Sequence, residues 1–148
     1  MSEQADISGG PISLVIPGKP EYISLARLLA GVVGVRELLD EEVIADLKLA
    51  LSEACTSFLW GPEGDPLADR TAGPVKPSSL QVDFAIAPDV WEITISDPAH
   101  AYLLPPLAGR GPMSEEALGL TIINALVDSM EQLESPEGGS MIRLVKKL

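Results

Sequence analysis

Residues 49–59 read LALSEACTSFL, and the spacing of their apolar side chains predicts a helix with two different faces. Upstream, Asp40 is a good N-cap, and Glu41 and Glu42 suit the positive end of a helix dipole. We therefore expect a helix over residues 41 to about 59. Its core stripe is expected to contain Ile44, Leu47, Leu51, Ala54 and Phe58. A different face of this helix carries Asp46, Ala50, Glu53 and Ser57.

The rest of the chain predicts five strands and two further helices. Apolar runs and alternation predict strands at residues 12–16, 80–86, 91–96, 132–135 and 140–148. A first helix over residues 20–36 carries an apolar repeat of Tyr22, Leu25, Ala26, Leu29, Val32 and Val33. A third helix, capped by Ser114, has an expected core stripe of Leu118, Ile122, Ala125, Leu126 and Met130. This order predicts one mixed sheet with three helices on one face, an α/β two-layer sandwich.

Composition narrows the class of protein. The chain has 148 residues, the size of one domain, and its formal net charge is -12. This acidity disfavours direct binding to nucleic acid or to an anionic membrane, and it favours a basic protein partner. The first ten residues lack the features of a secretory signal, and no apolar run is long enough to span a membrane. We therefore expect a cytoplasmic protein with a flexible tail over residues 1–10 and a single domain over residues 11–148.

Proline and glycine are abundant, with 13 of each, and they cluster in two loops. Residues 61–78 and 98–112 show no helical or strand periodicity, and both predict loops of defined shape rather than a disordered chain. Cys55 is the single cysteine, so no disulfide forms within the chain. We expect it to be a buried structural thiol, and His100, the single histidine, to be a solvated loop residue.

Three stretches resemble a known family. They are SEACT within residues 49–59, the preceding IPGKPEYISLARLLAGVVG, and the C-terminal LGLTIINALVDSMEQLESPEGGSMIRLVKKL. Together they resemble the GHKL ATPase superfamily, and within it the anti-sigma-factor serine kinases of bacterial stress and sporulation switches. The resemblance implies the Bergerat fold, with a mostly antiparallel sheet, and one histidine-kinase-like ATPase domain over residues 11–148.

The resemblance assigns chemistry to the SEACT helix. Glu53 stands at the position of the family's general base, although an ordinary solvated glutamate explains the residue equally well. Ser57 stands where the family has an Asn that ligates Mg²⁺ beside ATP. A serine hydroxyl can bind Mg²⁺, but it is shorter than Asn, and Mg²⁺ is strict about distance. Ser57 is thus the predicted metal ligand, and because it replaces the family's Asn, we expect it to weaken catalysis.

A second set of residues resembles the family's adenine site. Asp97 follows the strand at residues 91–96 and stands where the family's Asp accepts the adenine amino hydrogen. Ala99 and Ala101 replace the two glycines of the family's DxGxG box, and Ala101 remains a predicted cofactor contact. Methyl groups there are expected to crowd the base. The alternative is that Asp97 only caps a loop.

The remaining cofactor contacts fall in the would-be lid and the last turn. Arg110, Gly111 and Gly119 correspond to the family's Gly-rich lid, which binds phosphates at a helix N-terminus. Ser140 follows Gly138 and Gly139, as a hydroxyl does in the family's GGT box near the adenine-reading Asp. A simple connector and a Gly-Gly hairpin turn explain the same residues without a nucleotide.

Two functions remain open on these residues. One is a regulator that binds a sigma factor, an anti-anti-sigma antagonist or both, with weakened binding of ATP and Mg²⁺. The other is an active kinase that phosphorylates a serine of the antagonist. A regulatory domain of another pathway, such as a sensor-kinase-like subunit, is a third possibility. The resemblance also implies a homodimer through the side of the first strand and first helix.

Overall fold

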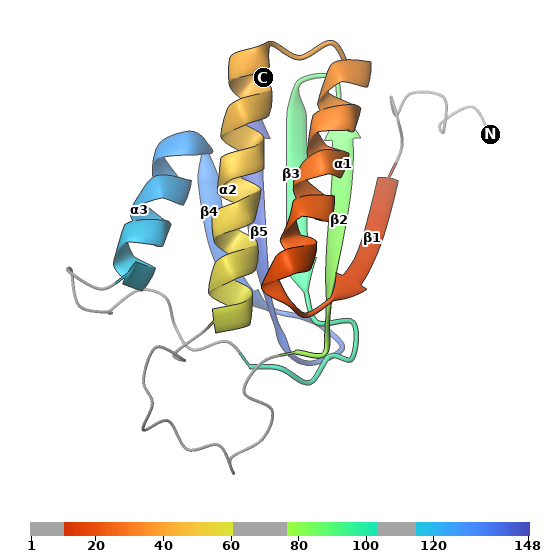
Figure 1. Ribbon diagram of the computed structural model, residues 1–148, viewed down its shortest axis with the longest axis vertical. Helices are drawn as coiled ribbons and strands as arrows, with labels where there is room; N and C mark the ends of the chain where they lie inside the picture. Colours follow the sequence, from red (N-terminus) through yellow and green to blue (C-terminus); the bar gives the residue numbers. More distant parts are fainter. Residues whose placement is uncertain (1–10, 61–76, 104–114) are drawn as a thin grey trace.

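The computed structural model describes residues 11–60, 77–103 and 115–148 (Figure 1). The predicted tail and most of both Pro/Gly-rich loops lie outside the described residues. In chain order the elements are β1 (Pro11–Pro17), the 3-10 turn η2 (Pro20–Tyr22), α1 (Ile23–Arg36), α2 (Glu41–Trp60), β2 (Ser79–Ala87), β3 (Val90–Ser96), α3 (Glu115–Leu126), β4 (Ser129–Glu134) and β5 (Ser140–Lys147). The predicted order of strands and helices is confirmed.

The five described strands form one sheet in the order β1-β2-β3-β5-β4. Every neighbouring pair is antiparallel, so the prediction of a mixed sheet is wrong for the described strands. The connections explain this arrangement. The α1–α2 pair returns the chain to the end of the sheet where β1 finished, and α3 makes β4 run parallel to β3 (Figure 1). Strand β5 then inserts between β3 and β4, so both of its pairs are antiparallel.

The three α-helices cover one face of the sheet, with α2 packed against both α1 and α3 (Figure 1). The strands alternate accordingly, and in β2 the buried side chains are those of Leu80, Val82, Phe84 and Ile86. Helix α2 buries Leu47, Leu51, Ala54 and Phe58, as predicted, whereas Ile44 is only half-buried. Ala50 is fully buried, so the prediction that it lies on a face apart from the core stripe is wrong. It contributes to the core between the helix and its neighbours.

Helix α1 is apolar on both its inner and its outer face. The inner residues are Ile23, Ala26, Ala30, Val33 and Gly34. The outer face carries Leu25, Leu28, Val32 and Val35, with exposed fractions of 45%, 62%, 58% and 67%. The apolar repeat predicted for this helix is therefore divided between core and surface. None of the described helices, α1 included, is long and apolar enough to cross a membrane.

The C-terminal elements differ from the prediction in detail. Ile123 and Val127 are buried, whereas Ala125 is exposed and Ile122 is half-buried, so the predicted core stripe of α3 was offset. Met130 lies in β4 rather than in the helix, and β4 starts earlier than predicted. Ser114 and the side chain of Leu118 lie outside the described residues. The helix is short and apolar on most sides, which makes its helical phase hard to read from spacing.

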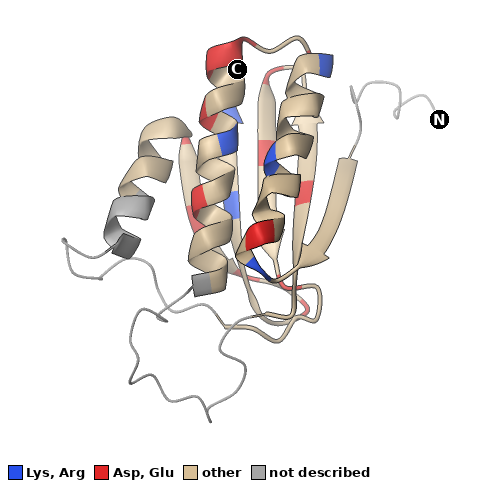
Figure 2. Cartoon of the chain, in the orientation of Figure 1, with Lys and Arg blue, Asp and Glu red and all other residues tan. Residues whose placement is uncertain are grey.

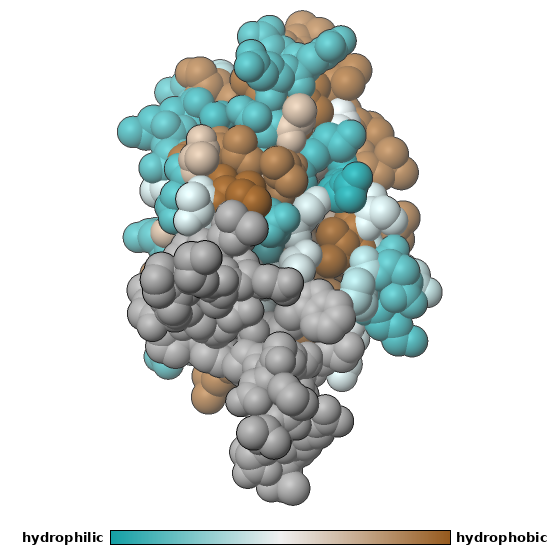
Figure 3. All heavy atoms as spheres, turned by 60° about the vertical axis from the view of Figure 1, so that its left-hand side comes forward, coloured by the Kyte–Doolittle hydropathy of each residue, from teal (hydrophilic) through white to brown (hydrophobic). Residues whose placement is uncertain are grey.

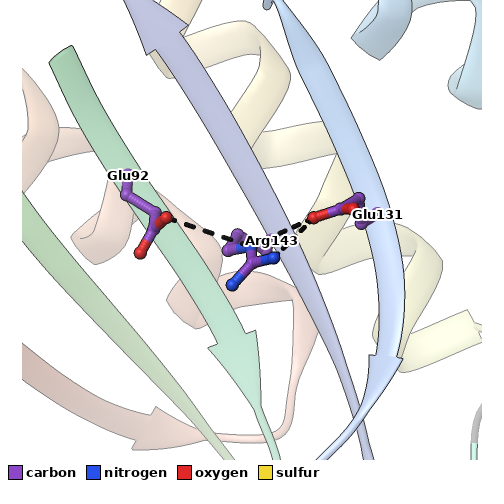
Figure 4. Close-up of polar contacts among 3 residues, drawn as sticks. All are labelled: Glu92, Glu131 and Arg143. Atoms are coloured by element: carbon purple, nitrogen blue, oxygen red, sulfur yellow. Dashed lines mark hydrogen bonds and ion pairs between the residues drawn. The ribbon is translucent and has the colours of Figure 1, made fainter.

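The sheet face away from the helices carries a charge network across three strands. Arg143 on β5 lies between Glu92 on β3 and Glu131 on β4 (Figure 4). Its Nη2 donates to Glu131 Oε1 at 2.7 Å, and its Nε lies 3.9 Å from Glu92 Oε2. The hydrogen bond that Arg143 donates to Glu131 raises the pKa of Arg143, so the guanidinium stays charged. Exposed pairs of this kind contribute little to stability, but they favour this strand register.

Candidate functional site

The two residues that the resemblance places at the chemistry, Glu53 and Ser57, lie one turn apart on α2. Residues four apart share one side of a helix, and both side chains are half-buried. No hydrogen bond or ion pair engages either side chain within the described part of the chain. Ser57 is followed directly by the buried Phe58.

The carboxylate of Asp97 is directed into its own loop. It is 4% exposed. Its Oδ1 accepts a hydrogen bond from the Ala99 N–H at 2.9 Å, and its Oδ2 accepts from the N–H groups of Ala101 at 3.1 Å and Tyr102 at 2.9 Å. A carboxylate has about four lone-pair sites, so three donors leave it little capacity for a base. The loop-capping interpretation of Asp97 is therefore realised in the structure.

The same loop explains why the two missing glycines are tolerated. Among the described non-glycine residues, only Leu38 and His100 have a positive φ, and the φ of His100 is 56°. Ala99 and Ala101 thus adopt ordinary backbone conformations. The left-handed conformation falls on His100, which lies between them. Because His100 has a Cβ, this conformation costs conformational free energy. His100 is exposed, as expected from the sequence.

Gly138 and Gly139 pack against this loop from the turn between β4 and β5. Both have positive φ, 108° and 81°. A Cβ built on Gly139 would lie 3.0 Å from the carbonyl carbon of His100, so the turn has no room for a side chain there. Ser140, which is 6% exposed, donates its backbone N–H to the Tyr102 carbonyl at 2.8 Å. The Gly-Gly turn thus serves contact with the Asp97 loop as well as strand reversal.

Tyr102 joins this loop to α2. The ring is 3% exposed and lies against Phe58, with ring centroids 5.4 Å apart. Sequence reasoning placed Phe58 in the helix core and Tyr102 in a loop, but it did not pair them. No local spacing rule connects residues so distant in sequence. The contact brings the Asp97 loop to the end of α2 that carries Ser57.

The predicted lid is described only in part. Arg110 and Gly111 lie outside the described residues, so no contact can be assigned to them. Gly119 lies within α3, as the sequence predicted, and α3 packs against α2. Of the predicted cofactor contacts, the structure therefore brings together Asp97, Ala101 and Ser140. Phe58, the residue after Ser57, contacts Tyr102 of the same loop.

Cys55 has no place in this chemistry. It lies in the hydrophobic core with no exposed surface, and burial raises the pKa of its thiol to about 12. A thiol of this kind stays protonated and unreactive at neutral pH. The sequence prediction of a buried structural thiol is confirmed.

Two described residues, Ser57 and Asp97, weaken the fit of a site for ATP and Mg²⁺. Ser57 offers a single short hydroxyl, and within residues 11–60, 77–103 and 115–148 no three His, Cys, Asp or Glu side chains gather as metal ligands do. The adenine-reading position, Asp97, is already engaged by three backbone donors. An adenine amino group would have to share the Asp97 carboxylate with these three backbone donors.

Comparison with known proteins identifies the family. The family described as "Histidine kinase-like ATPase domain" matches residues 16–146. The chain belongs to this family. This match confirms the family resemblance of the SEACT helix and the C-terminal segment, and it confirms the predicted ATPase-type fold.

The relatives narrow the family further. The chain is 32% identical over 142 residues to the serine-protein kinase RsbW of Listeria monocytogenes serovar 1/2a, covering 88% of this chain and 83% of the relative. It is 28% identical over 147 residues to RsbW of Bacillus licheniformis, covering 92% and 86%. Among solved structures, a chain of the SiaB–SiaC complex from Pseudomonas aeruginosa is similar in fold. That match has a TM-score of 0.57 at 12% identity, and it covers 99% of this chain and 93% of the other.

Proposed function

We propose that this chain is a cytoplasmic partner-switching regulator of transcription, of the anti-sigma-factor type, in which binding of ATP is weakened. Its partners are a sigma factor, an anti-anti-sigma protein or both, and it makes no direct contact with nucleic acid. The names of the RsbW relatives support the class of regulator. The net charge of -12 supports a basic protein partner, because opposite charge steers association.

The observation that carries the weakened nucleotide site is the hydrogen bonding of Asp97. Three backbone N–H groups of its own loop occupy the carboxylate, and Tyr102 closes the loop against Phe58. An adenine amino group at Asp97 would be a fourth donor to a buried carboxylate that already accepts three backbone hydrogen bonds. Switching in such a protein rests on competition between partners rather than on phosphoryl transfer.

Calorimetry with ATP tests this proposal. The protein is titrated with ATP in the presence of MgCl₂ and again in the presence of EDTA. We expect no binding in the micromolar range under either condition. Micromolar binding that depends on Mg²⁺ would overturn the proposal, because it would mean that the Asp97 loop opens at little cost.

The alternative is an active ATP-dependent serine kinase that phosphorylates an anti-anti-sigma protein. Glu53 favours it, because its half-buried carboxylate is unengaged by the described residues and stands at the position of the family's general base. In such a kinase Ser57→Asn is expected to strengthen Mg²⁺-dependent binding of ATP. Ser57→Ala is the matched control. Equal ATP binding by both variants would show that Ser57 is not the defect.

The homodimer implied by the resemblance stays a prediction. The predicted side, formed by the first strand and the first helix, supports it. Strand β1 is an edge strand whose Val15 is 56% exposed, and α1 exposes Leu28 at 62% and Val32 at 58%. An unpaired strand edge can join a second copy through backbone hydrogen bonds. Sedimentation velocity at micromolar concentration measures the state directly, and a mass near 15.6 kDa would contradict the dimer.

A further inference from the structure

Three segments lie at one end of the molecule: the loop after β3, the last turns of α2 and the turn between β4 and β5 (Figure 1). Asp97 begins the first segment, Ser57 lies on the second, and Ser140 follows the third. The family resemblance assigns a nucleotide contact to each of these three residues. The side chain that lies between the segments therefore decides whether a flat ring can enter.

Tyr102 contacts all three segments. Its N–H donates to Asp97 Oδ2 at 2.9 Å, and its carbonyl accepts from the Ser140 N–H at 2.8 Å. Its ring lies against Phe58 of α2, with ring centroids 5.4 Å apart and planes inclined at 47°. Successive helical residues are about 100° apart around the axis, so Phe58 flanks Ser57 on the inner side of α2. The Tyr102 ring thus occupies space between the Asp97 loop and α2.

The Tyr102 side chain is buried within an otherwise exposed stretch. Ala101 and Leu103 on either side are exposed, and residues 101–103 form no helix or strand. On the face turned forward in Figure 3, hydrophobic patches are separated by hydrophilic side chains. The Tyr102–Phe58 pair instead lies beneath the surface, with exposed fractions of 3% and 0%. One ring, inserted from a surface loop, therefore fills this space.

Charge around Tyr102 favours an uncharged ligand. The only basic residue of α2 is Lys48, and it lines the groove beside α1. The described residues of the Asp97 loop and of the β4–β5 turn include no Lys or Arg (Figure 2). Arg110 of the predicted lid lies outside the described residues. A nucleoside therefore suits the described part of this site better than a triphosphate does.

We propose that the Tyr102 ring occupies the position of a nucleobase and thereby closes a site that would otherwise admit a nucleoside. The ring and the base exclude each other, so a smaller side chain at residue 102 admits the base. The inference rests on the proposed function and deepens it, because it names the side chain that closes the nucleotide site. Tyr102 is thus a residue that determines ligand specificity as well as a member of the core.

The exchange of one ring for another is physically balanced. Truncation of a buried aromatic side chain leaves a cavity that the surrounding structure fills only in part. Apolar cavities of this kind bind flat ring ligands. Phe58 would offer a base the aromatic contact that it now makes with Tyr102. Asp97 accepts three hydrogen bonds and has about one lone-pair site left, which suits an amino group on the base.

Calorimetry with adenosine tests the inference on the intact protein. Wild type, Tyr102→Ala and Tyr102→Phe are each titrated with adenosine up to millimolar concentration. We expect Tyr102→Ala to bind adenosine more tightly than the wild type by about tenfold or more. Tyr102→Phe keeps the ring and should bind as weakly as the wild type. NMR chemical-shift changes at the backbone amides of Ala99, Ala101 and Ser140 locate the bound base.

Phe84→Ala is the matched control. Phe84 is 1% exposed and lies against Trp91, with ring centroids 6.3 Å apart, so its truncation also leaves a cavity in the core. It pairs with Ile93 in the middle of β3, whereas Asp97 follows the end of that strand. We expect no gain in adenosine affinity from this variant, because its cavity lies away from the Asp97 loop.

Thermal denaturation shows whether each variant is folded. If Tyr102→Ala does not fold, Tyr102→Leu takes its place, because leucine keeps an apolar anchor while it frees part of the ring volume. We expect Tyr102→Leu to bind adenosine several-fold more tightly than the wild type.

Three results would overturn the inference. These are a folded Ala or Leu variant with no gain in affinity, an equal gain from Phe84→Ala or Tyr102→Phe, and shift changes that fall outside the Asp97 loop. The inference concerns the ratio of affinities between variant and wild type, whereas the proposed function concerns ATP binding by the wild type alone. A missing gain therefore leaves the proposed function intact, and micromolar ATP binding by the wild type contradicts that function whatever the ratio.

Discussion

The Asp97 loop and the outer face of α1 are two regions of the same small domain, and they differ in how their side chains are packed. Side chains of the loop are buried and bonded within the protein, whereas those of the helix face are exposed. In the loop, a buried carboxylate has three backbone donors, and Tyr102 is covered by Phe58. On α1, aliphatic side chains from Leu25 to Val35 remain exposed. In the region where the family resemblance predicts a ligand, the polar groups are paired within the loop, whereas α1, on the side of the predicted homodimer, leaves apolar side chains exposed.

This difference shows where binding free energy is available. Opening the loop for a nucleotide sacrifices hydrogen bonds that the folded protein already makes, whereas covering α1 removes apolar surface from water at a gain of about 25 cal/mol per Å². This comparison supports the proposal that the chain binds protein partners more readily than a nucleotide. Measurements of stability can test both halves of this comparison, the packing of the Asp97 loop and the exposure of α1.

Removing the Asp97 carboxylate should have the largest effect. Asp97→Ala leaves three backbone N–H groups without their acceptor, and we expect the free energy of unfolding to fall by about 3 kcal/mol or more. Asp97→Asn keeps one acceptor oxygen, so its free energy of unfolding should fall by roughly half as much. Urea denaturation measures both variants. An Ala variant as stable as the wild type would mean that the loop does not depend on this carboxylate.

The core beneath the loop should become sensitive to alkaline pH through Cys55. Burial raises the thiol pKa from 9.0 to about 12, so the unfolded state loses its proton first as the pH rises. Stability from the protonated buried thiol is complete below pH 9 and declines above it, by about 2 kcal/mol at pH 10.5. Because other groups titrate too, the measurement is the difference between wild type and Cys55→Ala at pH 8 and pH 10.5. A constant difference would contradict a dry core at this position.

The loop should gain stability when its left-handed residue becomes glycine. His100→Gly relieves the positive φ of 56°, and we expect a net gain of about 0.5–1 kcal/mol after the added flexibility of the unfolded chain. The matched control is Ala101→Gly, which restores a family glycine at a residue with an ordinary φ. This variant should be less stable than the wild type by about 0.5–1 kcal/mol. Thermal denaturation distinguishes the two, and a gain from Ala101→Gly would contradict the loop conformation described above.

The smallest effect on stability is expected at the α1 surface. Leu28 is 62% exposed, so Leu28→Gln should change the free energy of unfolding by less than about 0.5 kcal/mol. Ala26→Gln, on the buried face of the same helix, should be far more damaging, because it forces an amide into the core. Comparable losses in both variants would mean that the outer face is covered within the protein as isolated.

The family and most of the fold can be predicted from the sequence because local patterns of residues determine them. The SEACT helix and the alternation of β2 and β3 follow from the spacing of apolar side chains. The antiparallel pairing of β5 with both β3 and β4 is not local, because it depends on how α3 returns the chain. The helical phase of α3 was also missed, since Ile122 and Ile123 are equally apolar and only packing selects Ile123 for the core.

The candidate site divides in the same way. By itself the sequence determined that Glu53 and Ser57 share a helix side, that Asp97 follows a strand, and that both motif glycines of the Asp97 loop are replaced, because these are facts of order and spacing. Only the tertiary structure decided that Asp97 is engaged by its own loop and that Tyr102 lies on Phe58. It also decided that half of the apolar repeat of α1 faces outward. Such choices depend on which distant surfaces meet, and burial against those surfaces is not encoded in local spacing.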